Sequence, residues 1–326
     1  MTNFVARKVF WKIIMENIIE PIDKKLILSE LTPDKFVRKT NFGDNEIYIF
    51  KHFDSPNLLR EVGRLREFTF RNAGGGTGLA CDIDEYDTAE KPYSQLIVWD
   101  PRKQEILGGY RFITGNDAPT DAEGNPVLAT SQLFYYSDEF KKNYLPYIIE
   151  LGRSFVVPEN QAIGDGRRSL YTLDNLWDGL GTLIVDYPKA RYFFGKVTMY
   201  RHYNQEARNF LLYFMNMYFG GNESLMHLLN PLDLHFNLEQ LQAAFKGNDY
   251  KEDYRTLSRE VRARGERIPP LINSYMSLSS TLKVFGTSLN PYFGDVEETG
   301  IMVTIADIYK EKSERHVASY REGKQK

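Results

Sequence analysis

The sequence contains very little cysteine: Cys81 is the only one among 326 residues. A lone cysteine cannot form an intramolecular disulfide, which excludes the disulfide-stapled class of small extracellular domains and is typical of a reducing compartment. A cytoplasmic location is therefore expected. No histidine lies near Cys81 in the sequence to activate its thiol, so we interpret it as a small apolar residue rather than a nucleophile.

Long apolar runs are also missing, and no stretch approaches the ~20 residues that span a bilayer. The first apolar segment, residues 4–15, is interrupted by charge, and no small-residue cleavage site follows it. Its Val9, Phe10, Ile13 and Ile14 recur at helical spacing. This pattern predicts an amphipathic helix that docks on its own domain or makes peripheral contact with the inner membrane surface.

An excess of charge of one sign is absent as well. The formal net charge is -3 and the pI is near 6.0, which gives no overall basic face for nucleic acid. The histidines are dispersed without ligand spacing, so no metal is predicted. No Ser-His-Asp arrangement is recognisable, and a covalent acyl-enzyme is not expected. Hydrophobic residues make up 42% of the chain, which is ample for a core.

Hydrophobic periodicity predicts alternating strands and helices. The expected strands cover residues 46–50, 95–99, 106–113, 147–157, 191–199, 281–285 and 300–308, and the expected helices begin near residues 55, 170 and 206. The alternation in the middle of the chain indicates an α/β sheet with at least one crossover. We expect an N-terminal helical extension over residues 1–40 and a single domain over 41–326. Within that domain, residues 220–265 are expected to form a helical insertion and residues 312–326 a solvated tail.

Charged residues and glycines recur in a fixed order between residues 66 and 153. The order is Arg66-x-x-x-Phe70, Gly74 to Gly78, Asp84-x-Tyr86-Asp87, Gly108-x-x-Arg111 and Glu150-Leu-Gly-Arg153. It resembles the signature of acyl-homoserine lactone synthases. The glycine segment and the Glu-Leu-Gly-Arg-Ser-Phe-Val run are more similar still to a sister group, the hemolysin-like amino-acid N-acyltransferases that begin ornithine-lipid and glycine-lipid synthesis.

The resemblance implies a GNAT-like fold of the α/β (α+β) class, in which helices flank a central, mixed, twisted sheet. It also implies transfer of a fatty acyl chain, commonly 3-hydroxylated, to the α-amine of an amino acid, with glycine slightly preferred over ornithine. The implied donor is acyl carrier protein, or alternatively CoA, with no bound cofactor. Two other hypotheses remain open: an acetyl-CoA-dependent N-acetyltransferase, and a non-enzymatic, membrane-active protein of the hemolysin kind.

Glu150 is the first candidate for the general base that this chemistry needs. An unpaired carboxylate is costly inside an apolar strand, and an α-amine must lose a proton to attack a thioester. Proton removal could be direct or through water. Alternatively, Glu150 forms an ion pair with Arg153 that only holds the strand. Residues three apart on a flat strand point to opposite faces, so that pair would need a bulge.

The remaining residues of the signature are expected to act around this carboxylate. By the resemblance, Asp84 and Asp87 orient Arg66 and Arg111 or receive the substrate amine, whereas the residues alone indicate a solvated turn. The two arginines would then bind the substrate carboxylate by forked hydrogen bonds. The expected substrate-binding set also includes Phe70, Gly76 and Gly78, and Arg153 joins the catalytic set. The glycines would belong to a loop that covers a ligand, or to a flexible connector.

A further motif follows the strand of Glu150. Residues 161–166, with Gln161, Gly164 and Gly166, fit a pattern by which acetyltransferases of this fold bind pyrophosphate with backbone amides at a helix start. Arg167 and Arg168 would then bind the phosphopantetheine phosphate or an acidic carrier protein. Short motifs of this kind also arise by chance, and in that case both arginines are ordinary surface charges.

Overall fold

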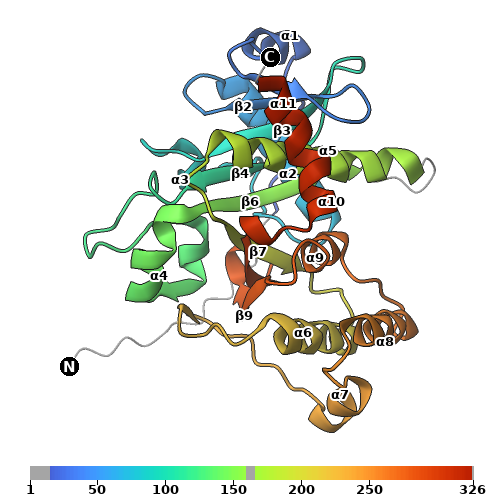
Figure 1. The fold of residues 1–326 in the computed structure, drawn as a ribbon. Coiled ribbons are helices and arrows are strands. Elements are labelled where there is room, and N and C mark those ends of the chain that lie inside the picture. The colour runs from blue at the N-terminus through green and yellow to red at the C-terminus, as the bar shows by residue number, and fades with distance from the viewer. Residues whose placement is uncertain (1–14, 159–165, 325–326) are drawn as a thin grey trace.

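Eight strands form one mixed sheet within the parts of the chain that the structure describes (Figure 1). A computed structural model describes residues 15–158 and 166–324, with side chains in the second range from residue 172 onward. In spatial order the strands are β1 (Phe36–Lys39), β2 (Glu46–Phe50), β3 (Ser94–Asp100), β4 (Glu105–Thr114), β6 (Ile148–Val156), β7 (Tyr192–Met199), β10 (Val296–Thr304) and β9 (Lys283–Asn290). The expected α/β sheet is confirmed, and the last two expected strands are shifted by a few residues.

β6 and β7 are parallel neighbours, and α5 (Gly166–Asp186) lies between them in the chain as the crossover. Their pairing covers only Ile148↔Tyr192 to Leu151↔Gly195, although both strands continue further. The two strands are therefore no longer paired toward their C-terminal ends. Beyond Leu151 and Gly195, this parting leaves backbone groups that the ladder between the two strands does not pair.

A β-bulge interrupts β6 at Arg153. The φ angle of Arg153 is 50°, and the register with β4 shifts between the pairs Arg111↔Gly152 and Gly109↔Phe155. Because the bulged strand then carries an extra residue, the side chains beyond Gly152 lose the simple alternation of a flat strand. The bulge brings Arg153 to the face of the sheet on which Glu150 lies.

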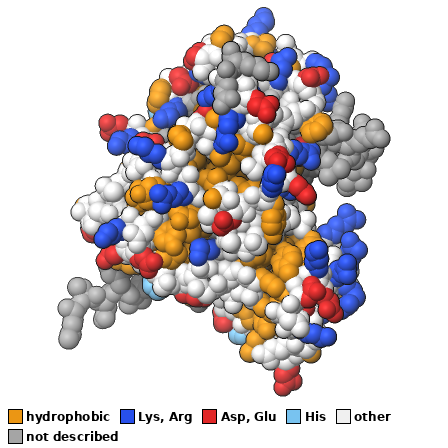
Figure 2. All heavy atoms as spheres, in the orientation of Figure 1, with side chains coloured by type: hydrophobic (Ala, Val, Ile, Leu, Met, Phe, Trp, Pro, Cys, Tyr) orange, Lys and Arg blue, Asp and Glu red, His pale blue; other side chains and the backbone are white. Residues whose placement is uncertain are grey.

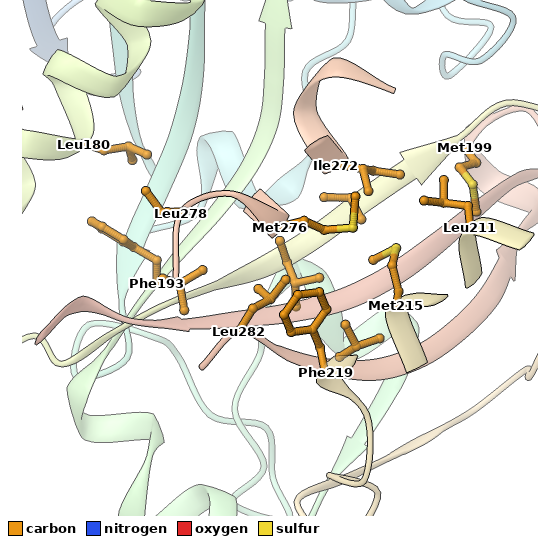
Figure 3. Packing of buried hydrophobic residues seen from close by; sticks show 14 of the residues in the cluster. Leu180, Phe193, Met199, Leu211, Met215, Phe219, Ile272, Met276, Leu278 and Leu282 are labelled. Carbon is orange, nitrogen blue, oxygen red and sulfur yellow. The ribbon is translucent and has the colours of Figure 1, made fainter. Parts of the chain in front are cut away.

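One face of the sheet packs against helices from the second half of the chain. These are α5, α6 (Gln205–Phe219), α8 (Tyr250–Ala263) and α9 (Pro270–Met276). Figure 3 shows Ile272 and Met276 of α9 directed toward Leu211 and Met215 of α6 above the strands. Some hydrophobic side chains remain visible in the middle of the surface drawn in Figure 2. Among the described helices, none combines the length and hydrophobicity that a membrane span requires.

The opposite face packs against α2 (Pro56–Asn72), which lies behind the sheet in Figure 1. Pro56 opens this helix at a position where a missing N–H costs no hydrogen bond. Leu58, Val62 and Leu65 then recur at helical spacing and bury against β2 and β3. A second apolar cluster on this face contains Phe134 of β5 (Phe134–Tyr136), and several buried charged side chains lie on the same face.

The N-terminal boundary expected at residue 41 does not separate two units. β1 is the edge strand of the sheet and pairs with β2, so the sheet begins at Phe36. In the described residues before it, α1 (Lys24–Glu30) is a short helix packed near α2. The amphipathic helix expected over Val9 to Ile14 lies outside the described residues.

Residues 220–265, where a helical insertion is expected, are helical over less than half of their length. They contain α7 (Leu238–Ala244) and α8, which buries Leu257 and Val261 in the core that α6 shares. They also contain a short strand, β8 (Met226–Leu228), which pairs with β5. The insertion is therefore joined to the main body by a small second sheet.

The prediction of a solvated C-terminal tail is wrong. Residues 310–324 form a helical segment that includes α10 (Lys310–Ser313) and α11 (Ser319–Lys324) and runs along α5 (Figure 1). Val317 and Tyr320 are buried, and the His316 ring lies 2.8 Å from Asp178 of α5. The tail is highly charged, but it contains apolar residues at helical spacing. Its basic residues pair with acidic residues of α5.

Candidate functional site

Arg66 is the centre of a buried ionic cluster on the α2 face of the sheet. Its Nε donates to Asp82 at 3.1 Å, and its Nη2 donates to Asp87 at 2.7 Å and to the Asp82 carbonyl at 2.7 Å. Its Nη1 donates to Gln95 at 3.2 Å and to Asp87 at 3.3 Å. Since these bonds use its donors and its side chain has no exposed surface, Arg66 cannot bind a substrate carboxylate here. The substrate contact expected for it is corrected to a scaffold role.

Arg111 of β4 extends the cluster. Its Nη1 donates to Asp84 at 2.6 Å and lies 3.1 Å from Asp87. Its guanidinium carbon lies 5.3 Å from the ring centroid of Tyr86 and 5.1 Å from that of Tyr93. Burial alone would lower the pKa of Arg111, but Asp87 and Asp84 raise it well above its ordinary value. Arg111 is therefore a fixed positive charge under the two aromatic rings.

Asp82 links Arg66 to Arg153 and was not singled out from the sequence. Its carboxylate lies 3.1 Å from Arg66 Nε and 3.0 Å from Arg153 Nε. Burial would raise the pKa of Asp82, but Arg153 and Arg66 hold it below the ordinary value. Burial would also raise the pKa of Asp87, but Arg66 and Arg111 lower it below the ordinary value. In the sequence, Asp82 could have been identified by its position two residues before Asp84 in the same acidic run.

Arg153 and Asp84 form the accessible end of the cluster. The side chain of Asp84 is 20% exposed and that of Arg153 is 14% exposed, whereas Asp82 and Asp87 are fully buried. Arg153 Nη2 lies 3.5 Å from Asp84, and the guanidinium carbon lies 4.3 Å from the Phe293 ring centroid. A substrate that approaches this cluster therefore meets Arg153 and Asp84 first.

Glu150 does not pair with Arg153, although the bulge that such a pair would need is present. Its carboxylate accepts hydrogen bonds from the hydroxyls of Tyr93 and Thr130 and from the amides of Ala129 and Thr130. The residue is 1% exposed. Direct contact between Glu150 and an incoming amine is incompatible with this arrangement. Proton acceptance by Glu150 stays a prediction, and it would require a relay through Tyr93 or Thr130.

The glycine segment is folded onto Glu67, another residue that was not singled out from the sequence. Buried Glu67 accepts hydrogen bonds from the Thr77 amide at 3.0 Å and the Gly78 amide at 2.8 Å. Gly76 has a φ of 99°, which a side chain rarely tolerates, and a Cβ there would lie 3.1 Å from Glu67. The amide of Gly78 is thus used to hold the loop, and the direct substrate contact expected for Gly76 and Gly78 is not supported.

Phe70 lies beneath this loop and is buried. Its ring packs edge-on against Phe293 at 5.0 Å, so Phe293 contacts both Phe70 and Arg153. A Cβ on Gly75 would lie 2.9 Å from the Tyr200 ring. Phe70 therefore supports the accessible end of the cluster from behind, through Phe293.

The pyrophosphate motif is described only in part. Gln161 and Gly164 lie outside the described residues, and Gly166 is the first residue of α5. Arg167 and Arg168 follow in the first turn, and their side chains also lie outside the described part.

Cys81 shows no sign of thiol activation. Burial raises the pKa of its thiol to about 11, so the thiol remains protonated at neutral pH. The side chain packs beside α2, where a Cβ on Gly63 would lie 2.6 Å from its sulfur. The expected role of Cys81 as a small packed residue agrees with this position.

The cluster combines a fixed buried half with an accessible half that carries one cation and one carboxylate. Asp84 caps α3 (Glu85–Thr88) by accepting from the Tyr86 amide at 3.0 Å, so its carboxylate is held in place. Arg153 is positioned by Asp82. Such a pair can stabilise negative charge on a carbonyl oxygen and accept a proton from an amine nearby.

The chain is similar to proteins that carry out acyl transfer. Residues 65–164 match the acetyltransferase (GNAT) domain family, and this range includes the whole ionic cluster. A glycine N(alpha)-acyltransferase of Bacteroides thetaiotaomicron is 52% identical over 94% of this chain and 91% of that protein. One of Phocaeicola vulgatus is 51% identical over 94% of both chains.

Two solved structures of a CoA-dependent acyl-homoserine lactone synthase, one with SAM and isopentyl-CoA and one with MTA, also align with the fold. Their TM-scores are 0.37 and 0.38, at 11% identity over 85% of this chain and 90% of that chain. The GNAT-like fold and the acyltransferase class expected from the sequence are confirmed by the domain match and the two acyltransferase relatives.

Proposed function

The chain belongs to the glycine N(alpha)-acyltransferase family, and we propose that it transfers an acyl group from a thioester to the α-amine of glycine. The observation that carries this proposal is the 52% identity over 94% of the chain. The similarity extends over nearly the full length of both proteins. The ordered arrangement of Arg111, Asp84 and Arg153 agrees with it.

The proposed reaction forms a carbon–nitrogen bond and breaks a carbon–sulfur bond. The amine nitrogen attacks the thioester carbonyl carbon, and the thiolate leaves. The glycine ammonium loses two protons overall: one passes to a protein carboxylate and then to solvent, and one ends on the leaving thiolate. The ammonium of a free α-amino acid is almost fully protonated at neutral pH, so a base is needed to generate the nucleophilic amine.

We assign the roles at the accessible end of the cluster by exposure. Arg153 stabilises the oxyanion that forms on the thioester carbonyl, because it is the cluster's accessible cation. Asp84 accepts the proton from the amine, because it is the accessible carboxylate. Arg66, Asp82 and Asp87 act as positioning residues behind them. Glu150 holds Tyr93 against Arg111 and so positions that charge.

We further propose that the donor is a fatty acyl chain on acyl carrier protein, and that the product is an N-acyl glycine that enters aminolipid synthesis in the cytoplasm. The sequence resemblance to aminolipid enzymes supports this choice. The parting of β6 and β7 supports a pantetheine thioester of either kind, since an extended phosphopantetheine arm can pair with free strand backbone. A product with a long acyl chain would partition into a membrane, so peripheral contact with the inner membrane is part of the proposal.

A reconstituted assay tests the proposal. The purified protein is incubated with glycine and either an acyl carrier protein thioester or the CoA thioester of the same chain. We expect N-acyl glycine by mass spectrometry and one free thiol per product, with faster turnover on the carrier protein. Faster turnover on CoA would overturn the donor assignment alone. The absence of acyl glycine with both donors, from protein that is folded by circular dichroism, would overturn the function.

A further inference from the structure

A cavity of about 330 Å³ lies beyond the C-terminal end of β7. It is separate from the ionic cluster and is not used by the roles assigned above. The residues that line it include Tyr200, Arg201, Tyr203, Arg208, Asp295 and Glu297. Tyr203 immediately precedes the N-cap of α6, and Arg208 is in the first turns of that helix.

Charges of both signs line this cavity in equal number. Arg208 Nη1 lies 2.6 Å from Glu297, and Arg201 Nη1 lies 2.8 Å from Asp295. A phosphate dianion would face the two carboxylates at short range and be repelled by both. A zwitterion carries one charge of each sign and is complementary to this lining.

Arg208 is built as a binding residue rather than a surface charge. The residue is only 8% exposed, and Glu297 holds its Nη1 at the wall of the cavity. Its guanidinium is therefore a positioned positive charge at this wall. The start of α6 adds the positive end of a helix dipole on the same side. Both features favour a carboxylate beside Arg208.

From this geometry we propose that the cavity binds a free α-amino acid as a zwitterion. The carboxylate of the ligand lies against Arg208, and its ammonium lies against Glu297. The use of glycine as the test ligand rests on the proposed function. A volume of about 330 Å³ exceeds what glycine fills, so the cavity accepts larger amino acids as well.

Glycine binding to the full-length protein, measured by titration calorimetry without an acyl donor, tests the proposal. We expect Arg208→Gln to weaken binding roughly 10- to 100-fold, as for the loss of a charge-assisted hydrogen bond. Arg264→Gln is the matched control. Arg264 is also largely buried and ion-paired, with Glu206 and Glu260, but it does not line the cavity. Equal affinity in Arg208→Gln and the wild type, or no glycine binding to the wild type, would overturn the proposal.

A second measurement covers the case in which Arg208→Gln does not fold. Crystals of the wild-type protein are soaked in glycine, and density between Arg208 and Glu297 is expected. Density at another place only would overturn the proposal. Ornithine and acetate are compared in the same way, and acetate, which has no ammonium, is expected to bind at least tenfold more weakly than glycine.

Steady-state kinetics then distinguish whether the cavity is the acceptor site of the reaction or a separate effector site. If Arg208→Gln raises KM for glycine by the same factor as Kd, the cavity holds the acceptor. If Kd rises and KM does not, the cavity is an effector site distinct from the acceptor site. Both results support amino-acid binding. A wild-type protein that binds glycine here but forms no acyl glycine would contradict the proposed function and leave this inference standing.

Discussion

Asp87 and Arg66 form an ion pair 2.7 Å long in which neither side chain has any exposed surface. Asp87 also accepts a hydrogen bond from Gln95 at 2.8 Å. The pair is therefore part of a hydrogen-bonded network on the α2 face. A buried charge is tolerated only where its partners replace the water it has lost. The pair is therefore a structural element that fixes α2 against β3 and holds the accessible residues in place.

Asp87→Asn is expected to lower the free energy of unfolding by about 3–5 kcal/mol, because Arg66 and Arg111 would each lose a buried anionic partner. Urea denaturation followed by circular dichroism measures the change. Asp295→Asn is the control, since its pair with Arg201 is largely exposed and its loss should cost less than about 1 kcal/mol. Equal effects of both variants would contradict a structural role for the buried pair.

The same pair predicts how stability depends on pH. The pKa values of Asp87 and Asp82 are lowered in the folded state by their arginine partners, against the effect of burial. Their contribution is present above the unfolded-state value of about 3.9 and is lost as the pH falls from there through the folded-state pKa. The difference in the free energy of unfolding between the wild type and Asp87→Asn should therefore become smaller below about pH 4. A difference that is constant from pH 7 to pH 3 would contradict this dependence on the protonation of Asp87.

Local patterns in the sequence predicted some elements well. β6 was placed within one residue of each end because apolar residues favour a strand at both of its ends and Pro158 follows it. The order of charged residues identified most members of the cluster. The sequence did not predict which of these residues are buried and which are accessible. The partners of Arg66 lie 16 to 29 residues away in the chain, and only folding brings them together.

The position of Glu150 shows the same limit. A carboxylate in an apolar strand indicated either a base or an ion pair, and the strand itself offers no other partner. The donors that satisfy it come from Tyr93 and from residues 129–130, about 20 residues before it in the chain. No local pattern connects that segment to β6. The C-terminal tail was misjudged for a related reason, because its partners are the acidic residues of α5.

Glu67→Gln is expected to loosen the glycine segment. Glu67 accepts from Arg71 at 2.7 Å and from the Thr77 and Gly78 amides, and a glutamine can replace only part of these bonds. The cost should be about 1–3 kcal/mol, and the Gly78 amide should exchange its hydrogen faster. Glu85→Gln, on the exposed side of α3, is the control. Unchanged exchange at Gly78 would show that Glu67 does not hold the loop.

Asp84→Asn and Glu150→Gln together test which carboxylate accepts the proton from the amine. Asparagine caps a helix as well as aspartate, so Asp84→Asn should stay folded while kcat falls by about 10²- to 10⁴-fold. Glu150→Gln should lose about 1–3 kcal/mol of stability, because it loses part of its bonding to Tyr93 and Thr130, and its kcat per folded molecule should fall less. Thr130→Val removes one donor to Glu150 and one of the two relay hydroxyls while the charge of Glu150 is kept, and its kcat should stay close to that of the wild type because Asp84 accepts the proton. Steady-state rates with thermal unfolding curves check all three variants. If folded Glu150→Gln loses turnover and Asp84→Asn retains it, Glu150 is the proton acceptor through a hydroxyl relay and the role assigned to Asp84 is wrong.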